Sequence, residues 1–349
     1  MKYFLYTSEK TDYFYENIKK YITDQYKNGD VVKVSFDDEN YSDFIRASGL
    51  CMIIGEGCAC AFGEDGYLYK LYSNHAEKYK KYPSDLPAKS IKRQFRYLKK
   101  ALADQNYRNR VARKFGDHTI AKMGDGIFGF DRFVFVKGSD AVPFRFKKAK
   151  GDDRPLIIYF GGAGTIGHDN FKPLFEFWFS TRGYRFISEN CNILIPQSMR
   201  LCNYATEGEI RDVYSETCID IIKYLIRNYG IDHKRVYVYG TSFGGGMVWN
   251  ILLNSPELFA AVVETVGEYL GSKKTDEIAF DSISSIPVWM AHSSDDKVVS
   301  VKSDDRFYDA LTKVGANVKY TRWDKYGHGM CTKFYRKEKW LEWLLSNSK

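Results

Sequence analysis

The chain has 349 residues, of which 44% are hydrophobic and 28% charged, and its formal net charge is +8 at pH 7. This length and hydrophobic fraction suffice for one large domain plus a smaller one, which excludes a disordered or fibrous chain. No stretch approaches the roughly 18 consecutive apolar residues of a membrane span, and the start becomes charged before a signal-peptide core could form. We therefore expect a cytoplasmic protein without a membrane partner.

The seven cysteines are an odd number scattered through a large chain. This pattern is typical of reduced thiols and not of a disulfide framework. Cys58 and Cys60 stand close together, but they lack a second pair at metal-ligand spacing. We therefore expect no metal site, and the sequence implies no organic cofactor.

Residues 1–125 show neither an internal repeat nor a catalytic spacing. Short apolar runs alternate there with helical stretches, which predicts a smaller α+β region of unknown role. The runs lie at 31–36, 50–54 and 67–71, and the helical stretches lie near 10–28 and 88–114. Glycines at 124, 126 and 129 indicate a boundary, so the second domain is predicted to span 126–349 and to start with a hairpin of strands 132–136 and 143–146.

The segment 78–114 carries 13 Lys or Arg side chains against two acidic ones. This positive charge invites a nucleic-acid interpretation. An apolar stripe at helical spacing nevertheless gives the predicted helix a face for packing; it consists of Ile91, Phe95, Leu98 and Leu102. We favour a solvated basic face and expect no nucleic-acid partner.

From residue 151 onward, continuous apolar runs alternate with helical segments, which is typical of a parallel sheet covered by helices on both faces. The predicted strands are 156–160, 192–195, 236–239, 260–263, 288–291 and 318–323, and the predicted helices are 209–228, 244–254, 302–314 and 334–346. The predicted fold class is therefore α/β with a mostly parallel sheet. Ligands bind at the carboxyl ends of the strands in such sheets.

The run Gly240-Thr-Ser242-Phe-Gly244 follows a predicted strand and precedes a predicted helix. This is the context of a nucleophilic serine on a sharp strand-to-helix turn, where the glycines two residues before and after leave room for the backbone. The glycine spacing alone is weak because the chain has 28 glycines, so the flanking strand and helix carry the argument. Ser242 is the candidate nucleophile.

A nucleophilic serine needs a base within hydrogen-bond reach, and only His292 and His328 follow Ser242 in the chain. His292 continues a predicted strand, whereas His328 lies in a loop before the final helix, so we favour His328 as the base. Asp295 and Asp296 follow the strand 288–291, where a carboxylate that orients the imidazole is expected. Either aspartate fits this place, and we favour Asp296.

An acyl-transfer intermediate needs preorganised donors for its oxyanion. The amide of Phe243, the first after the nucleophile, is one candidate, and the amide of Ala163 in the loop Gly161-Gly-Ala-Gly164 is the other. Alone, these glycines also fit an ordinary turn or a phosphate loop, although the usual Gly-Lys-Ser/Thr ending is missing. The candidate substrate contacts are Gly162 and Trp249. Trp249, Met199 and Arg200 are candidates for the pocket wall, but ordinary packing or a solvated loop explains these three residues at least as well.

Residues 150–345 resemble the α/β-hydrolase superfamily, and within it the esterase branch that includes feruloyl esterases, polyhydroxybutyrate-depolymerase-like esterases and serine peptidases. Five segments match in the correct order: 161–170 its oxyanion segment, 231–245 its nucleophile segment, 255–261 the stretch after the nucleophile helix, 292–299 its acid loop and 326–328 its histidine. The resemblance implies an α/β-hydrolase fold. It also implies that the acid stands four residues after His292, which is Asp296.

Together these observations predict a serine esterase that cleaves a small-molecule or oligomeric ester through an acyl-enzyme on Ser242, with His328 and Asp296 completing a Ser-His-Asp triad. Two alternatives remain open. The same triad also serves serine peptidases, and a noncatalytic interaction protein could use the hydrolase fold as a scaffold. The sequence does not indicate the acyl group, the leaving alcohol or the oligomeric state.

Overall fold

The computed structural model describes residues 27–33, 129–137, 140–166, 172–179, 181, 183, 190–198, 208–269, 271, 273 and 275–349. Several predicted features lie outside these residues: the helix before residue 27, the elements at 50–54, 67–71 and 88–114, the basic segment 78–114, the Cys58 and Cys60 pair, and Met199 and Arg200. The chain divides into two compact units, one of Met1–Ala141 with Gly167–Phe171 and the other of Val142–Ile166 with Lys172–Lys349. The boundary predicted at residue 126 stays a prediction.

The described part of the first unit contains two antiparallel strands. Strand β1 (Val31–Lys33) pairs with β2 (Asp131–Lys137), so that Val32 stands opposite Val134. Five successive residues of β2 are buried, which fits its nearly continuous run of apolar and aromatic residues.

The second unit is built on a mostly parallel sheet. Its strands follow the order β3 (Asp140–Lys147), β5 (Asn192–Pro196), β4 (Arg154–Phe160), β6 (Ile231–Thr241), β7 (Ala261–Thr265), β8 (Val288–Ser293) and β9 (Val318–Trp323). Strand β3 runs antiparallel to β5, and all the later pairs are parallel. Strands β5, β7 and β8 are buried along their whole length, as continuous apolar strands in a sheet covered on both faces should be.

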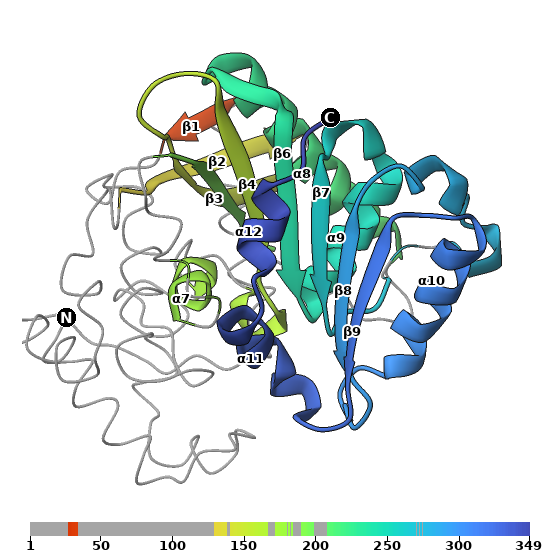
Figure 1. Ribbon diagram of the computed structural model, residues 1–349. Helices are drawn as coiled ribbons and strands as arrows, with labels where there is room; N and C mark the ends of the chain where they lie inside the picture. Colours follow the sequence, from red (N-terminus) through yellow and green to blue (C-terminus); the bar gives the residue numbers. More distant parts are fainter. Residues whose placement is uncertain are drawn as a thin grey trace, which may run out of the picture. The chain divides into compact units, whose positions relative to one another are not determined.

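Helices cover both faces of this sheet (Figure 1). One face carries α8 (Gly208–Asn228), α9 (Phe243–Asn254) and α10 (Val301–Lys313), and the other carries α7 (Lys172–Phe179), α11 (Met330–Lys337) and α12 (Trp340–Leu345). On the first face, Trp249 of α9 packs on Phe307 of α10. On the second face, Tyr239 of β6 packs on Tyr335 and Trp340. This arrangement confirms the predicted α/β class.

Two helical predictions need correction. The single helix predicted over 334–346 is two helices, because Glu338 takes an extended conformation (φ −82°, ψ 149°) between α11 and α12. Helix α7 was not predicted, since its short apolar sequence KPLFEFWF shows no clear helical periodicity. Short 3-10 helices complete the described structure: η3 (Ala163–Thr165), η5 (Pro256–Leu258), η6 (Thr275–Glu277), η7 (Phe280–Ile283) and η8 (Gly327–Gly329).

The strand order defines where a ligand can bind. The chain passes from β4 to its neighbour β5 on one side and then to β6 on the other side, so the direction of winding reverses beside β4. Such a switch point leaves a crevice at the carboxyl ends of the strands.

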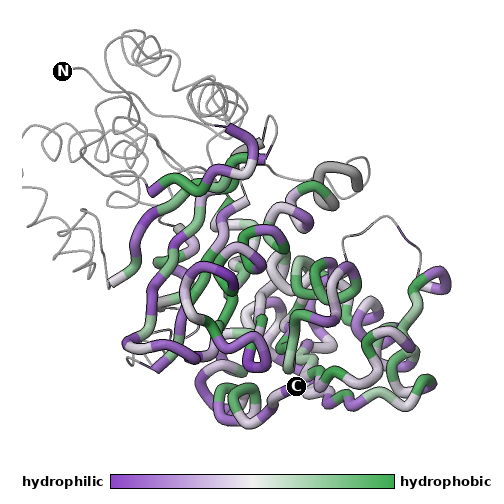
Figure 2. The backbone as a smooth tube through the Cα atoms, turned by 90° about the horizontal axis from the view of Figure 1, so that it is seen from above, coloured by the Kyte–Doolittle hydropathy of each residue, from purple (hydrophilic) through white to green (hydrophobic). Residues whose placement is uncertain are grey.

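Seen from above, hydrophobic stretches gather among the central strands and helices, and hydrophilic stretches lie mainly at the periphery (Figure 2). None of the described helices has both the length and the apolar character of a membrane span.

Candidate active site

Ser242 occupies a strained turn between β6 and α9. Its backbone has φ 57° and ψ −120°, a conformation that non-glycine residues rarely adopt. The Ser242 amide donates to Thr265 O of β7 at 2.9 Å, and the Ser242 carbonyl accepts from Gly246 N of α9 at 3.0 Å. The neighbouring strand and the helix thus hold the turn from both sides, and the side chain stands at the carboxyl end of β6.

Gly240 and Gly244 are required by close backbone approach. A Cβ on Gly240 would collide with the Gly244 carbonyl, and a Cβ on Gly244 would collide with the Phe160 carbonyl at the end of β4. The two glycines therefore let α9 begin directly against β6 and β4, as the sequence pattern predicts.

Gly244→Ala should lower the free energy of unfolding by about 1–3 kcal/mol or more, because the new methyl group meets backbone atoms that cannot rotate away. Gly164→Ala is the matched control in the nearby loop, since a Cβ there meets nothing within 4 Å, and its effect should stay within about 0.5 kcal/mol. Urea unfolding followed by circular dichroism measures both. Equal effects of the two substitutions would contradict the proposed backbone contact.

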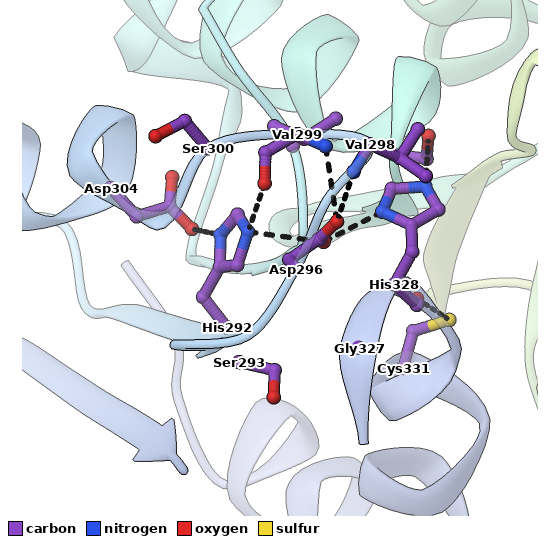
Figure 3. Close-up of polar contacts among 12 residues, drawn as sticks. His292, Ser293, Asp296, Val298, Val299, Ser300, Asp304, Gly327, His328 and Cys331 are labelled. Carbon is purple, nitrogen blue, oxygen red and sulfur yellow. Dashed lines mark hydrogen bonds and ion pairs between the residues drawn. The ribbon is translucent and has the colours of Figure 1, made fainter. Parts of the chain in front are cut away.

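His328 and Asp296 form a continuous hydrogen-bond chain with Ser242. His328 Nε2 lies 2.8 Å from Ser242 Oγ, and His328 Nδ1 lies 2.7 Å from Asp296 Oδ2. His328 belongs to η8, between β9 and α11, and Asp296 follows β8 (Figure 3). The imidazole is 27% exposed, whereas the Asp296 carboxylate is fully buried, so the chain of contacts runs from the protein interior to an accessible hydroxyl.

The two adjacent aspartates have different partners. Asp296 Oδ1 accepts hydrogen bonds from the amides of Val298 at 2.8 Å and Val299 at 3.1 Å, which leaves Oδ2 facing His328. Asp295 Oδ1 instead accepts from Ser293 Oγ at 2.6 Å and from Gly327 N at 2.8 Å. These bonds, that from Ser293 first, lower the pKa of Asp295 below its usual value. Asp295 therefore links the loop after β8 to the loop that carries His328, and of the two aspartates only Asp296 contacts the imidazole.

The loop after β4 passes close to the nucleophile. A Cβ on Gly162 would lie 3.7 Å from Ser242 Cβ. The Gly162 amide donates to Glu176 Oε1 of α7 at 2.9 Å, and Tyr159 Oη donates to the same oxygen at 2.6 Å. Burial first, and then the Glu176 carboxylate, raise the pKa of Tyr159 well above its usual value, so the phenol stays a donor. The Gly162 amide is thus already engaged, and the next amide, that of the exposed Ala163, is the candidate oxyanion donor in this loop.

Phe243 supplies the other candidate donor. It is the first residue of α9, and a helix begins with amides that have no partner inside the helix and lie at the positive end of its dipole. Both predicted oxyanion donors therefore flank Ser242 in space, one from the loop after β4 and one from the helix N-terminus.

Trp249 does not contribute to this site, and its prediction as a substrate contact is wrong. The indole is fully buried and packs on Phe307 of α10, on the face of the sheet that α9 covers. Trp249 follows Ser242 by only seven residues, but this closeness in sequence did not reveal that the indole is buried in the core. Sequence reasoning also missed Glu176, which no motif connects with a loop 14 residues earlier.

The structure gives little support for cysteine or metal chemistry around Ser242. Cys331 Sγ donates to His328 O at 3.6 Å, and burial raises the pKa of this thiol to about 11, so it is neutral at physiological pH. Among the described residues, no group of three or more His, Cys, Asp or Glu side chains is placed to hold a metal ion. The arrangement suits acyl transfer to a hydroxyl that a neighbouring imidazole deprotonates.

Comparisons with known proteins show similarity to hydrolases. Residues 203–340 match the family model described as phospholipase/carboxylesterase. Among solved structures, a thermostable esterase is 26% identical with a TM-score of 0.53, and the alignment covers 63% of each chain. Dipeptidyl peptidase 4 of Porphyromonas gingivalis has a similar fold, with a TM-score of 0.51 and 14% identity over 63% of this chain and 35% of that one.

A curated relative is dipeptidyl peptidase family member 6 of Caenorhabditis elegans. It is 24% identical over an alignment 209 positions long, which covers 50% of this chain but only 28% of the relative. The chain thus spans about a quarter of that relative and 63% of the thermostable esterase. Each of these proteins has a substantial part that the alignment does not cover.

Proposed function

Because the chain belongs to the α/β-hydrolase superfamily, we propose that it is a serine esterase that cleaves a carboxylic ester through an acyl-enzyme on Ser242. Its esterase and peptidase relatives support a serine hydrolase. The observation that carries the finer proposal is the hydrogen-bond chain from buried Asp296 through His328 to Ser242 Oγ, with 2.7 Å and 2.8 Å between the paired atoms. This is the geometry that a nucleophile, its base and an orienting carboxylate require.

In the first half of the reaction, Ser242 Oγ attacks the ester carbonyl carbon and its proton passes to His328 Nε2. Asp296 Oδ2 accepts the Nδ1 proton and stabilises the imidazolium that forms. The amides of Phe243 and Ala163 donate to the oxyanion of the tetrahedral intermediate. When the intermediate collapses, the carbon–oxygen bond to the alcohol breaks, and the Nε2 proton passes to the leaving alkoxide. The acyl group stays on Ser242.

In the second half, a water molecule attacks the acyl carbon and gives its proton to His328 Nε2. The second tetrahedral intermediate collapses, the bond to Ser242 Oγ breaks, and the proton returns to Oγ. The products are the carboxylic acid and the regenerated enzyme. Every proton moves through one imidazole nitrogen, so the chemistry needs no group beyond the residues named here.

A serine peptidase is the second candidate, and the dipeptidyl peptidase relatives are the observation that favours it. The same residues cleave amides, so the triad does not separate the two substrates. We place the ester first, and the match to the phospholipase/carboxylesterase family model and the 26% identical esterase structure support this order.

The purified protein should react covalently with a fluorophosphonate probe and should hydrolyse p-nitrophenyl esters faster than peptide p-nitroanilides. A series of esters of graded acyl length, with feruloyl esters alongside, measures the size of the acyl pocket. Faster cleavage of peptides than of every ester would make the protein a peptidase. Absence of both labelling and turnover would leave the noncatalytic scaffold as the remaining hypothesis.

A further inference from the structure

A second histidine lies buried behind the Asp296 carboxylate. His292 stands on β8 with a side chain that is 0% exposed. Its Nδ1 lies 2.7 Å from Asp304 Oδ2 of α10. Its Nε2 lies 3.1 Å from Val299 O and 3.3 Å from Asp296 Oδ2 (Figure 3). The same Asp296 oxygen therefore faces both His292 and His328.

The partners of His292 determine where its protons are. A carbonyl oxygen can only accept, and Asp296 Oδ2 already accepts the Nδ1 hydrogen of His328, so an unprotonated Nε2 would face two acceptors. Such an arrangement is unfavourable in a buried site, where each polar atom needs a partner of the opposite kind. Nε2 of His292 therefore carries a hydrogen that points between Val299 O and Asp296 Oδ2. This holds whether the proton between Nδ1 and Asp304 lies on the ring or on the carboxyl group.

Two buried carboxyl groups, those of Asp304 and Glu264, lie behind His292, and Asp304 contacts the ring. Glu264 of β7 is 0% exposed, and its Oε1 accepts from Gly267 N at 2.6 Å. Asp304 and His292 are among its electrostatic neighbours. Burial raises the pKa of both carboxyl groups well above the usual range. The contact of Asp304 Oδ2 with Nδ1 thus fixes the imidazole on the side away from Asp296.

We propose that His292 is a positioning residue for hydrolysis: its Nε2–H holds the Asp296 carboxylate in the orientation that His328 needs, and Asp304 holds His292. This inference rests on the proposed function of Ser242, His328 and Asp296. His292 touches neither substrate nor nucleophile, and it acts on the reaction only through Asp296. Outer partners of metal-ligating side chains contribute about 10- to 100-fold to activity, and we expect an effect of similar size from His292.

Two isosteric substitutions separate the two ring nitrogens. In His292→Gln, the amide nitrogen takes the place of Nε2 and keeps a donor toward Asp296 and Val299 O. In His292→Asn, the shorter amide takes the place of Nδ1, so the donor toward Asp296 is lost. His233→Asn is the matched control, because His233 is exposed at the start of β6.

His292→Asn should lower kcat for ester hydrolysis by about 10- to 100-fold with little change in KM, since substrate contacts are untouched. His292→Gln and His233→Asn should stay close to the wild type. Equal losses in the Asn and Gln variants would overturn the proposal, because a general packing role needs no donor at Nε2. If His292→Asn does not fold, His292→Gln still decides: a folded Gln variant with a large loss of kcat contradicts the role of the Nε2 donor.

A readout without turnover distinguishes failure of this inference from failure of the proposed function. The hydrogen between His328 Nδ1 and Asp296 should give a far-downfield proton NMR signal, identified by its absence in His328→Gln. This signal should persist in His292→Gln and should vanish or exchange faster with water in His292→Asn. An unchanged signal in His292→Asn would refute the positioning role. The expected NMR pattern in a protein that neither labels nor hydrolyses would instead refute only the proposed function.

Discussion

Replacing Ser242 by alanine should lower kcat for ester hydrolysis by about 10⁶-fold, since the attacking oxygen is removed while the surrounding groups remain. The fold should survive, because alanine at this position keeps the backbone contacts of the turn and removes only Oγ. Initial rates with the best p-nitrophenyl ester, together with the circular dichroism spectrum and the midpoint of thermal unfolding, measure the two effects. Retained turnover in a natively folded Ser242→Ala protein would refute the assignment of the nucleophile.

His328→Ala should lose as much activity as Ser242→Ala, because a nucleophile and its base act as one unit. The double variant should then be no slower than either single variant, and the residual rate comes from the oxyanion donors and substrate binding. His233→Ala is the control for loss of an imidazole, since that side chain is exposed and lies at the opposite end of β6 from Ser242. A double variant far slower than both single variants would show that the two residues act independently.

The sequence predicted those parts of the fold that local patterns specify. The continuous apolar runs of β4, β5, β7 and β8 coincide with buried strands, because a strand covered on both faces consists mostly of apolar residues. The turn around Ser242 was predictable for a similar local reason, since only glycine fits at 240 and 244. The order of the motifs along the chain then placed Ser242, Asp296 and His328 at the carboxyl ends of neighbouring elements, where the structure brings their side chains together.

Contacts between distant segments were not predictable in this way. The extended Glu338 between α11 and α12 has neither a glycine nor a proline beside it, so the break depends on tertiary packing such as that of Trp340 against Tyr239 and Tyr335. The burial of two carboxyl groups behind His292 was not predicted for the same reason. Glu264 reads as the polar end of a strand, and Asp304 reads as a solvated acid in the first turn of a helix. Only their three-dimensional proximity shows that both are buried beside one imidazole.

The acid loop keeps the two oxygens of Asp296 in separate roles. Two backbone amides occupy Oδ1, and two imidazoles face Oδ2. An amide side chain at this position would place its oxygen on the backbone donors and its nitrogen toward the imidazoles. Asp295 differs, because only its Oδ1 has partners among the described bonds, and an asparagine oxygen can replace it there.

Asp296→Asn should therefore lower kcat by about 10⁴-fold, whereas Asp295→Asn should change kcat little. In the first variant, the new amide nitrogen donates toward His328 Nδ1, so the neutral imidazole carries its hydrogen on Nε2 and cannot accept the proton of Ser242 Oγ. In the second variant, the bonds from Ser293 Oγ and Gly327 N are retained. Steady-state kinetics of both variants with one ester, and the rate of fluorophosphonate labelling as a check on the nucleophile, provide the measurement. A larger loss in Asp295→Asn than in Asp296→Asn would transfer the role of the acid to Asp295, and comparable small losses would mean that His328 is oriented without a carboxylate.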